Sequence, residues 1–171
     1  VDEAYAHFAD ENLLDELPKY KNLVLLRTFS KAFGLGGVRL GYAIGHPEVI
    51  SEIAKVMLPY CVSGINEAVG LSLLEHPELV EKYVTEIKIE RARMYQSMSN
   101  FSAMKVYPSQ TNFLIFQVAD AAKTFQDLLN EKILVRNVSI AQSLPNTLRV
   151  SVGTPEENDQ FLGALQKVVQ K

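Results

Sequence analysis

The chain has 171 residues, of which 47% are hydrophobic and 22% are charged, and its formal net charge is −3. This composition is typical of a globular protein with one or two domains. The slight excess of acidic residues argues against a nucleic-acid partner, because proteins that bind nucleic acids usually have a basic face. One cysteine, Cys61, excludes an internal disulfide and suits a reducing compartment, while no stretch approaches the roughly 20 apolar residues of a membrane span. We therefore expect a cytoplasmic protein with no nucleic-acid partner and no membrane partner. We also expect no metal site.

The first five residues, Val1-Asp2-Glu3-Ala4-Tyr5, lack an initiator methionine and read as the end of a strand. We expect the chain to be a fragment, the carboxyl-terminal part of a longer protein. A carboxylate at a strand end, such as Asp2, can pair with a protonated ring nitrogen, and a nearby phenol, Tyr5, can hydrogen-bond a ring oxygen. The alternative is that Asp2 caps the following turn and Tyr5 packs.

A lysine lies just after an apolar run at residues 23–26, which predicts a buried strand. Glycines follow Lys31, so a ligand can approach the backbone closely there. A desolvated lysine is an amine nucleophile, and Arg39 with the hydroxyls of Thr28 and Ser30 suits a phosphate. A lysine that can form an imine beside a phosphate clamp suggests pyridoxal 5′-phosphate (PLP). The alternative is a solvated loop lysine.

The glycines of this loop fit neither of the common phosphate motifs. Arg39 occupies the position where the dinucleotide fingerprint needs its third glycine, and no Gly-x-x-x-x-Gly-Lys-Ser/Thr pattern occurs. Both of those binding modes are therefore excluded.

Helices and strands alternate along the rest of the chain. Proline, glycine and capping residues mark the ends of the predicted helices, which cover residues 11–17, 47–58, 63–75, 78–100 and 120–132 and begin again at 154. Short runs of apolar and β-branched residues predict strands over residues 40–44, 104–107, 112–116, 133–136 and 147–152. Residues 143–146 read as a turn. In the long helix, we expect the charged side chains to form a solvated face (Glu86, Lys88, Glu90, Arg91 and Arg93).

Two arginines fall on predicted strands, whose interiors favour apolar side chains. Arg149 stands between Leu148 and Val150 and so points to the opposite face from both. The residues alone leave two readings for it, a solvated guanidinium on an exposed sheet face or an anion-binding group. Arg136 precedes it by 13 positions, on the neighbouring predicted strand.

These motifs together resemble those of fold-type-I PLP-dependent aminotransferases, and most closely histidinol-phosphate aminotransferases. The lysine segment carries the resemblance, with further matches at Asp2-x-Ala4-Tyr5 and in the strand that ends at Gly153 (Ser30-Lys31-Ala32-Phe33-Gly34 with Gly37, Arg39, Gly41 and Tyr42; Leu148-Arg149-Val150-Ser151-Val152-Gly153). The resemblance implies that Lys31 is the catalytic lysine and binds PLP. It implies further cofactor contacts from Asp2, Tyr5, Thr28, Ser30 and Arg39, and substrate contacts from Arg149 and Arg136.

The resemblance also implies an α/β fold in two parts. Residues 1–75 would form the carboxyl-terminal part of the PLP-binding large domain, with a mixed, mostly parallel sheet, and residues 76–171 a connecting helix and a small α+β domain. The implied reaction moves an amino group between glutamate and imidazole-acetol phosphate, in a homodimer. The family's remaining cofactor contacts would come from residues outside this sequence.

Two alternatives remain open at this point. Aromatic amino-acid aminotransferases and threonine-phosphate decarboxylases resemble the same segments, so the substrate could differ. The chain could also be a non-catalytic fragment that only folds or associates, because half of the implied site is not in the sequence.

Overall fold

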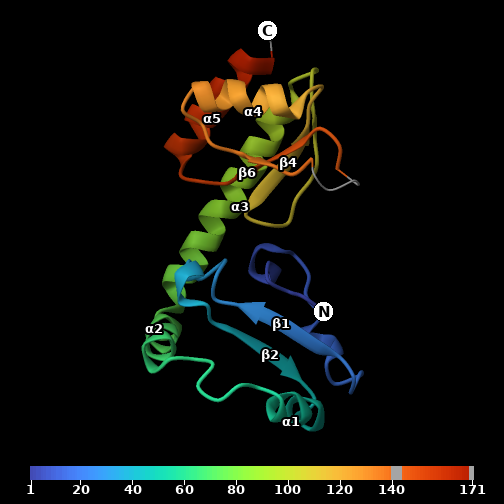
Figure 1. Cartoon of the computed structure of the whole chain (residues 1–171), viewed down its shortest axis with the longest axis vertical. Coiled ribbons are helices and arrows are strands. Elements are labelled where there is room, and N and C mark those ends of the chain that lie inside the picture. The colour runs from blue at the N-terminus through green and yellow to red at the C-terminus, as the bar shows by residue number, and fades with distance from the viewer. Residues whose placement is uncertain (140–143, 170–171) are drawn as a thin grey trace. The chain divides into compact units, whose positions relative to one another are not determined.

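The computed structural model describes residues 1–139 and 144–169, and it divides into two compact units, Val1–Val84 and Thr85–Lys171. Figure 1 shows the elements of both units along the chain. The helices and sheets give the α/β fold that the sequence predicts. The domain boundary expected between residues 75 and 76 stays a prediction. No helix among the described residues is long and apolar enough to cross a membrane.

The first unit is built on an antiparallel pair of strands, β1 (Val24–Thr28) and β2 (Gly41–Gly45), with Val24 opposite Gly45 and Thr28 opposite Gly41. Two helices follow the strands, α1 (Pro47–Lys55) and α2 (Gly64–Leu74), and three short 3₁₀ helices lie at Ala6–Phe8, Leu14–Glu16 and Gly36–Val38. A parallel bridge joins Asp2 to Leu26. The mostly parallel sheet expected for this part stays a prediction.

The strand predicted over residues 23–26 forms, but it is not buried on both faces. Leu25 is fully buried, whereas its neighbour Leu26 is 50% exposed. Successive side chains of a strand point to opposite faces, and within the described residues only one face of this small sheet is covered. Residues 41–43 of β2 are exposed as well.

The second unit contains a four-stranded antiparallel sheet in the order β3-β4-β6-β5. Its strands are β3 (Lys105–Val106), β4 (Phe113–Gln117), β5 (Arg136–Asn137) and β6 (Thr147–Ser151). Helix α3 (Pro77–Ser99) belongs to both units, and α4 (Ala121–Asn130) and α5 (Pro155–Val169) belong to this one (Figure 1). Its core consists of fully buried apolar side chains (Met94, Met98, Leu114, Phe116, Leu128, Leu148 and Leu165). Part of the turn predicted at residues 143–146 lies outside the described residues.

Three helix starts follow the predicted capping chemistry. The Ser63 hydroxyl accepts a hydrogen bond from the amide of Asn66 (3.2 Å) at α2, and the Asp120 carboxylate accepts one from the amide of Lys123 (2.9 Å) at α4. At α5, Thr154 and Glu157 form a reciprocal capping box: the Thr154 amide donates to Glu157 Oε2 (2.8 Å), and the Glu157 amide donates to Thr154 Oγ1 (3.3 Å).

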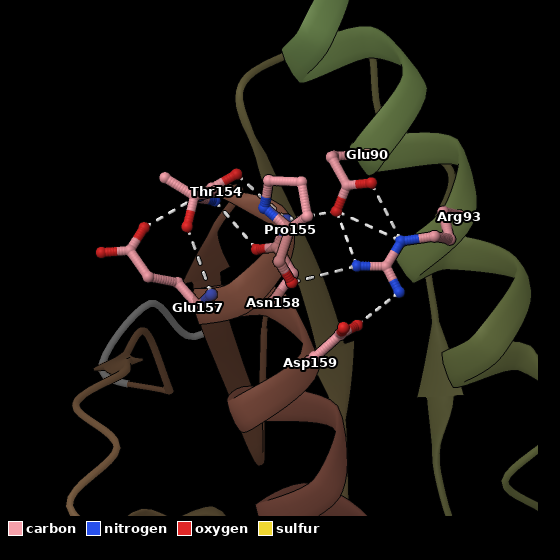
Figure 2. Close-up of polar contacts among 8 residues, drawn as sticks. Glu90, Arg93, Thr154, Pro155, Glu157, Asn158 and Asp159 are labelled. Atoms are coloured by element: carbon pink, nitrogen blue, oxygen red, sulfur yellow. Dashed lines mark hydrogen bonds and ion pairs between the residues drawn. The ribbon is translucent and has the colours of Figure 1, made fainter.

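We expected Glu90 to lie on the solvated face of α3, but the residue is only 8% exposed. It follows buried Ile87 by three residues and precedes buried Met94 by four, so the helical period places it on the buried face. There it accepts hydrogen bonds from Arg93 Nη2 (2.7 Å) and from Asn158 Nδ2 (2.8 Å) (Figure 2). The carboxylate is therefore paired and hydrogen-bonded, as a buried charge must be.

Asn158, which is 2% exposed, links this carboxylate to the end of β6. Its Oδ1 accepts a hydrogen bond from the amide of Gly153 (2.9 Å), and its Nδ2 donates to the Gly153 carbonyl (3.0 Å). A Cβ at residue 153 would overlap the Glu157 carboxylate, so a larger residue there would displace the Glu157 side chain from the capping box. The carboxyl end of β6 is thus fixed between α3 and α5 (Figure 2).

We predict that Glu90 makes folding stability depend on acid pH. Hydrogen bonds from Arg93, outweighing burial, lower the pKa of Glu90 below its ordinary value of 4.5. A carboxyl group with a lowered folded-state pKa contributes stability above its unfolded pKa, and this contribution is lost as pH falls through the folded pKa. Urea unfolding of the wild type and Glu90→Gln from pH 7 to pH 3 should show a difference in unfolding free energy that shrinks below about pH 4.5. A difference that stays constant with pH would contradict this.

Candidate functional site

The loop that carries Lys31 is held by its flanking residues rather than by Lys31 itself. Phe29 and Ala32 are buried, at 6% and 2% exposed, and anchor the loop on either side of the lysine. The Phe29 amide donates to the Leu40 carbonyl (3.0 Å), and the Leu35 amide donates to the Phe29 carbonyl (3.0 Å). Lys31 is therefore presented on a fixed turn, with its side chain partly exposed.

Tyr5 lies beside Lys31, although 26 residues separate them in the chain (31 − 5). Lys31 Nζ is 5.3 Å from the centre of the Tyr5 ring, which is a cation–π distance. Asp2 is exposed and accepts a hydrogen bond from the Ala4 amide through Oδ1 (2.9 Å), so it caps the turn that leads to Tyr5. Its predicted contact with a ring nitrogen stays a prediction.

Arg39 and Ser30 meet at the other side of the loop. Arg39 has a left-handed backbone (φ 56°), and its Nη1 donates to the Gly36 carbonyl (2.9 Å) and to Ser30 Oγ (3.4 Å). A guanidinium beside a hydroxyl, both accessible, fits a phosphate group. The Thr28 hydroxyl instead donates to the Leu40 carbonyl (3.3 Å) and accepts from the Ser30 amide (3.0 Å), so here it forms the turn. Its expected phosphate contact stays a prediction.

The residues of this loop fit a cofactor with an aldehyde and a phosphate group. An amine on a fixed turn, a ring beside it and a guanidinium–hydroxyl pair are the donors that such a molecule needs. By contrast, no group of three or more His, Cys, Asp or Glu residues within 1–139 and 144–169 could hold a metal ion.

Sequence analysis missed three residues near this loop. Glu3 and Arg27 form a buried ion pair (2.7 Å), and the signal for it was an arginine inside a strand, the same signal that singled out Arg149. The third is His7, which is partly buried: its ring lies edge-on to Phe33, with ring centres 5.2 Å apart. Burial and the charge of Arg27 lower the pKa of His7, which favours the neutral ring.

The second unit brings Arg136 and Arg149 directly opposite each other on β5 and β6. Leu148 and Val150 are buried and Arg149 is not, so it faces away from both, as predicted. Like charges directly opposite each other on a sheet destabilise it. The Arg149 guanidinium lies over the Phe113 ring (4.9 Å), and its Nε is buried without a hydrogen-bond partner among the described residues. Two guanidinium side chains at facing positions of a sheet suit an anion between them.

Comparison with known proteins places these observations in a family. The chain matches the family model for aminotransferase class I and II over residues 1–165. It is 43% identical over 171 residues to histidinol-phosphate aminotransferase 2 of Cupriavidus pinatubonensis, covering 99% of this chain and 46% of that protein. The chain thus spans about half the length of the curated relatives it matches.

Solved structures show the same fold. Histidinol-phosphate aminotransferase from Sinorhizobium meliloti, in complex with pyridoxal-5′-phosphate, superposes with a TM-score of 0.85 at 27% identity, over 99% of this chain and 48% of that one. L-threonine-O-3-phosphate decarboxylase from Porphyromonas gingivalis superposes with a TM-score of 0.87 at 24% identity, over 99% of this chain and 54% of that one. The fold alone therefore does not separate these two activities.

We predict that inorganic phosphate stabilises the protein through the opposed arginines. A ligand that binds only the folded state raises the unfolding temperature with its concentration. Sodium phosphate should raise the wild-type unfolding temperature more than sodium chloride of equal ionic strength, and Arg149→Gln should remove most of that difference. The control is Lys105→Gln, which removes an exposed cation from β3 of the same sheet. An equal phosphate effect in wild type and Arg149→Gln would exclude the anion site.

Proposed function

Since the chain belongs to the class I and II aminotransferase family, we propose that it carries half of the site of a PLP-dependent histidinol-phosphate aminotransferase. The proposed reaction moves an amino group from glutamate to imidazole-acetol phosphate and gives 2-oxoglutarate and histidinol phosphate. The observation that carries this proposal is the opposed arginine pair in a sheet that follows a PLP-type lysine loop. Both substrates are anions, and one is a phosphate ester, which suits two guanidinium groups.

Each residue of the lysine loop has a role in the proposed reaction. Lys31 would hold the cofactor through Nζ and would move a proton at the substrate's α-carbon. PLP, when bound, would supply an electron sink for the charge that develops there. Asp2 would keep the cofactor's ring nitrogen protonated, and Tyr5 would donate a hydrogen bond to the ring oxygen.

The phosphate end of the cofactor is assigned to the other side of the loop. Arg39 and Ser30, which already touch each other, would bind the phosphate, with the Thr28 hydroxyl reaching it after releasing Leu40. Arg149 would hold the anionic group of either substrate, a carboxylate of glutamate or the phosphate of imidazole-acetol phosphate, and Arg136 would contact mainly the phosphate.

We further propose that the protein acts as a homodimer in the cytoplasm. The segment between α1 and α2 exposes large apolar side chains, a feature of surfaces that bind another protein (Val56 81%, Leu58 77%, Tyr60 99%, and Ile65 of α2 77%). A second copy would cover this surface.

Two other functions remain candidates. The first is a PLP enzyme of the same fold that acts on an aromatic amino acid or on threonine phosphate and uses the same lysine loop. The superposition with L-threonine-O-3-phosphate decarboxylase is consistent with this alternative substrate. The chain by itself could also be a non-catalytic fragment, because it spans about half the length of its relatives.

We expect Lys31→Ala to abolish turnover in a protein of the relatives' full length, because no other residue is assigned to carry the proton. Borohydride reduction after addition of PLP should label Lys31 in the wild type, as peptide mapping by mass spectrometry would show. The matched control is Lys55→Ala, which removes an exposed lysine of α1 and should change neither result. Full activity of Lys31→Ala would contradict the proposed function. Labelling of the longer protein but not of this chain alone would favour the fragment reading.

We predict that substitution of Arg149 and of Arg136 will affect the rates on the two substrates differently. Each charge-assisted hydrogen bond contributes about 1.5–3 kcal/mol, so losing one lowers kcat/KM by roughly one to two powers of ten. Arg149→Ala should lower kcat/KM for glutamate and histidinol phosphate alike. Arg136→Ala should lower it more for histidinol phosphate than for glutamate. Steady-state rates on both substrates measure the difference.

The same assay, extended to phenylalanine and threonine phosphate, selects among the candidate substrates. We expect the wild type to prefer histidinol phosphate. A clear preference for phenylalanine, or decarboxylation of threonine phosphate, would overturn the substrate assignment and leave the PLP chemistry standing. Equal losses on both substrates in Arg136→Ala would remove its phosphate-specific role.

A further inference from the structure

We propose that the buried pair Glu3–Arg27 is a positioning device that holds Asp2 and Tyr5 in register with the lysine loop. This inference rests on the proposed function, in which Asp2 and Tyr5 contact the cofactor ring. Neither Glu3 nor Arg27 is assigned any contact with cofactor or substrate.

The geometry of the pair is that of a fixed fork. Arg27 Nε and Nη2 both donate to Glu3 Oε2, at 3.0 and 2.7 Å. The side chains are 11% and 8% exposed, respectively. The other carboxylate oxygen, Oε1, accepts a hydrogen bond from the Leu13 amide (2.7 Å). Both carboxylate oxygens of Glu3 therefore accept hydrogen bonds, one from Arg27 of β1 and one from the loop that follows the first 3₁₀ helix.

The proposed positioning role follows from where Glu3 and Arg27 lie in the sequence. Glu3 is the neighbour of Asp2, and Arg27 is the neighbour of Thr28, where β1 ends and the lysine loop begins. The ion pair therefore joins two segments that are 24 residues apart (27 − 3), each one residue from a predicted cofactor contact.

Residues 1–5 join β1 through one parallel bridge, between Asp2 and Leu26, and three backbone hydrogen bonds. The Glu3 amide donates to the Leu26 carbonyl (2.8 Å), the Leu26 amide to the Val1 carbonyl (2.9 Å) and the Val1 amino group to the Val24 carbonyl (2.7 Å). A slip of one residue would exchange the two faces of an extended segment and move Asp2 to the other side. The Glu3–Arg27 fork prevents that slip, because it fits only one register.

A stability role alone does not explain a charged pair at this place. Removing two charges from water costs about as much as their attraction returns, so an apolar pair of similar volume would hold the sheet as well. An apolar contact tolerates sliding, whereas a fork on one carboxylate oxygen does not. The His7 ring, which follows Tyr5 by two residues, packs edge-on against Phe33 of the lysine loop and adds a second contact between the two segments.

The test uses the protein of full length, loaded with PLP, and follows the cofactor's visible absorbance against pH. A ring nitrogen that keeps its proton is a cation, and a cation lowers the pKa of the lysine–cofactor linkage. Glu3→Gln, which keeps an acceptor for the Leu13 amide, should loosen Asp2 and move the absorbance midpoint to higher pH. Since a misplacement of about 1 Å can cost on the order of a hundredfold, kcat should fall by about ten- to a hundredfold with little change in KM.

Two further variants separate positioning from folding. Arg27→Lys keeps the charge and loses the fork, so it should shift the midpoint in the same direction even if Glu3→Gln fails to fold. Glu90→Gln breaks a carboxylate–arginine pair in the other unit whose carboxylate is about as buried as that of Glu3 (side chains 10% and 8% exposed), and it should lower stability without moving the midpoint.

The outcomes are distinct. An unchanged midpoint and kcat in folded Glu3→Gln, or an unchanged midpoint in Arg27→Lys, would overturn the inference. A shift in Glu90→Gln equal to that in Arg27→Lys would overturn it too, because lost stability would then be the cause. If the wild type shows no visible cofactor band and no borohydride label on Lys31, the proposed function itself has failed.

Discussion

The first unit depends on the register between its opening residues and β1. Three backbone hydrogen bonds and one forked ion pair hold residues 1–5 against the strand that leads into the lysine loop. Every other feature of the loop follows from that strand: Phe29 and Ala32 are buried behind it, Thr28 turns the chain, and Lys31 comes to lie beside Tyr5. The Lys31 amine thus lies beside Tyr5 on a turn that directly follows β1, the strand to which residues 1–5 are joined.

The second unit places two positively charged residues at facing positions of its sheet. Arg136 and Arg149 oppose each other in the sheet, and the repulsion acts on the two-residue strand β5. The strand that bears Arg149 is secured from both directions, by five paired positions with β4 and by the contacts of Asn158 with Gly153. These contacts fix β6 and with it the backbone position of Arg149, which we propose as an anion-binding residue.

Local chemistry explains why much of this was predictable. Ser63, Asp120 and Thr154 cap the helices that the sequence predicts, because capping involves residues only three or four apart. The outward direction of Arg149 followed from strand alternation alone. Leu26 and Glu90 were misjudged because their burial depends on what packs against them: nothing described covers the outer face of β1, and Asn158 of α5 meets Glu90 on α3.

The sequence by itself determined the family resemblance, the order of the elements and the residues able to carry the chemistry, since each of these rests on short-range patterns. Only the tertiary structure decided which distant residues meet: Glu3 with Arg27, Tyr5 with Lys31 and Arg136 with Arg149. Such contacts come from strand register and helix packing, in which a shift of one residue changes every partner. The physical reason is that side-chain direction is a local property, whereas side-chain partnership belongs to the folded chain.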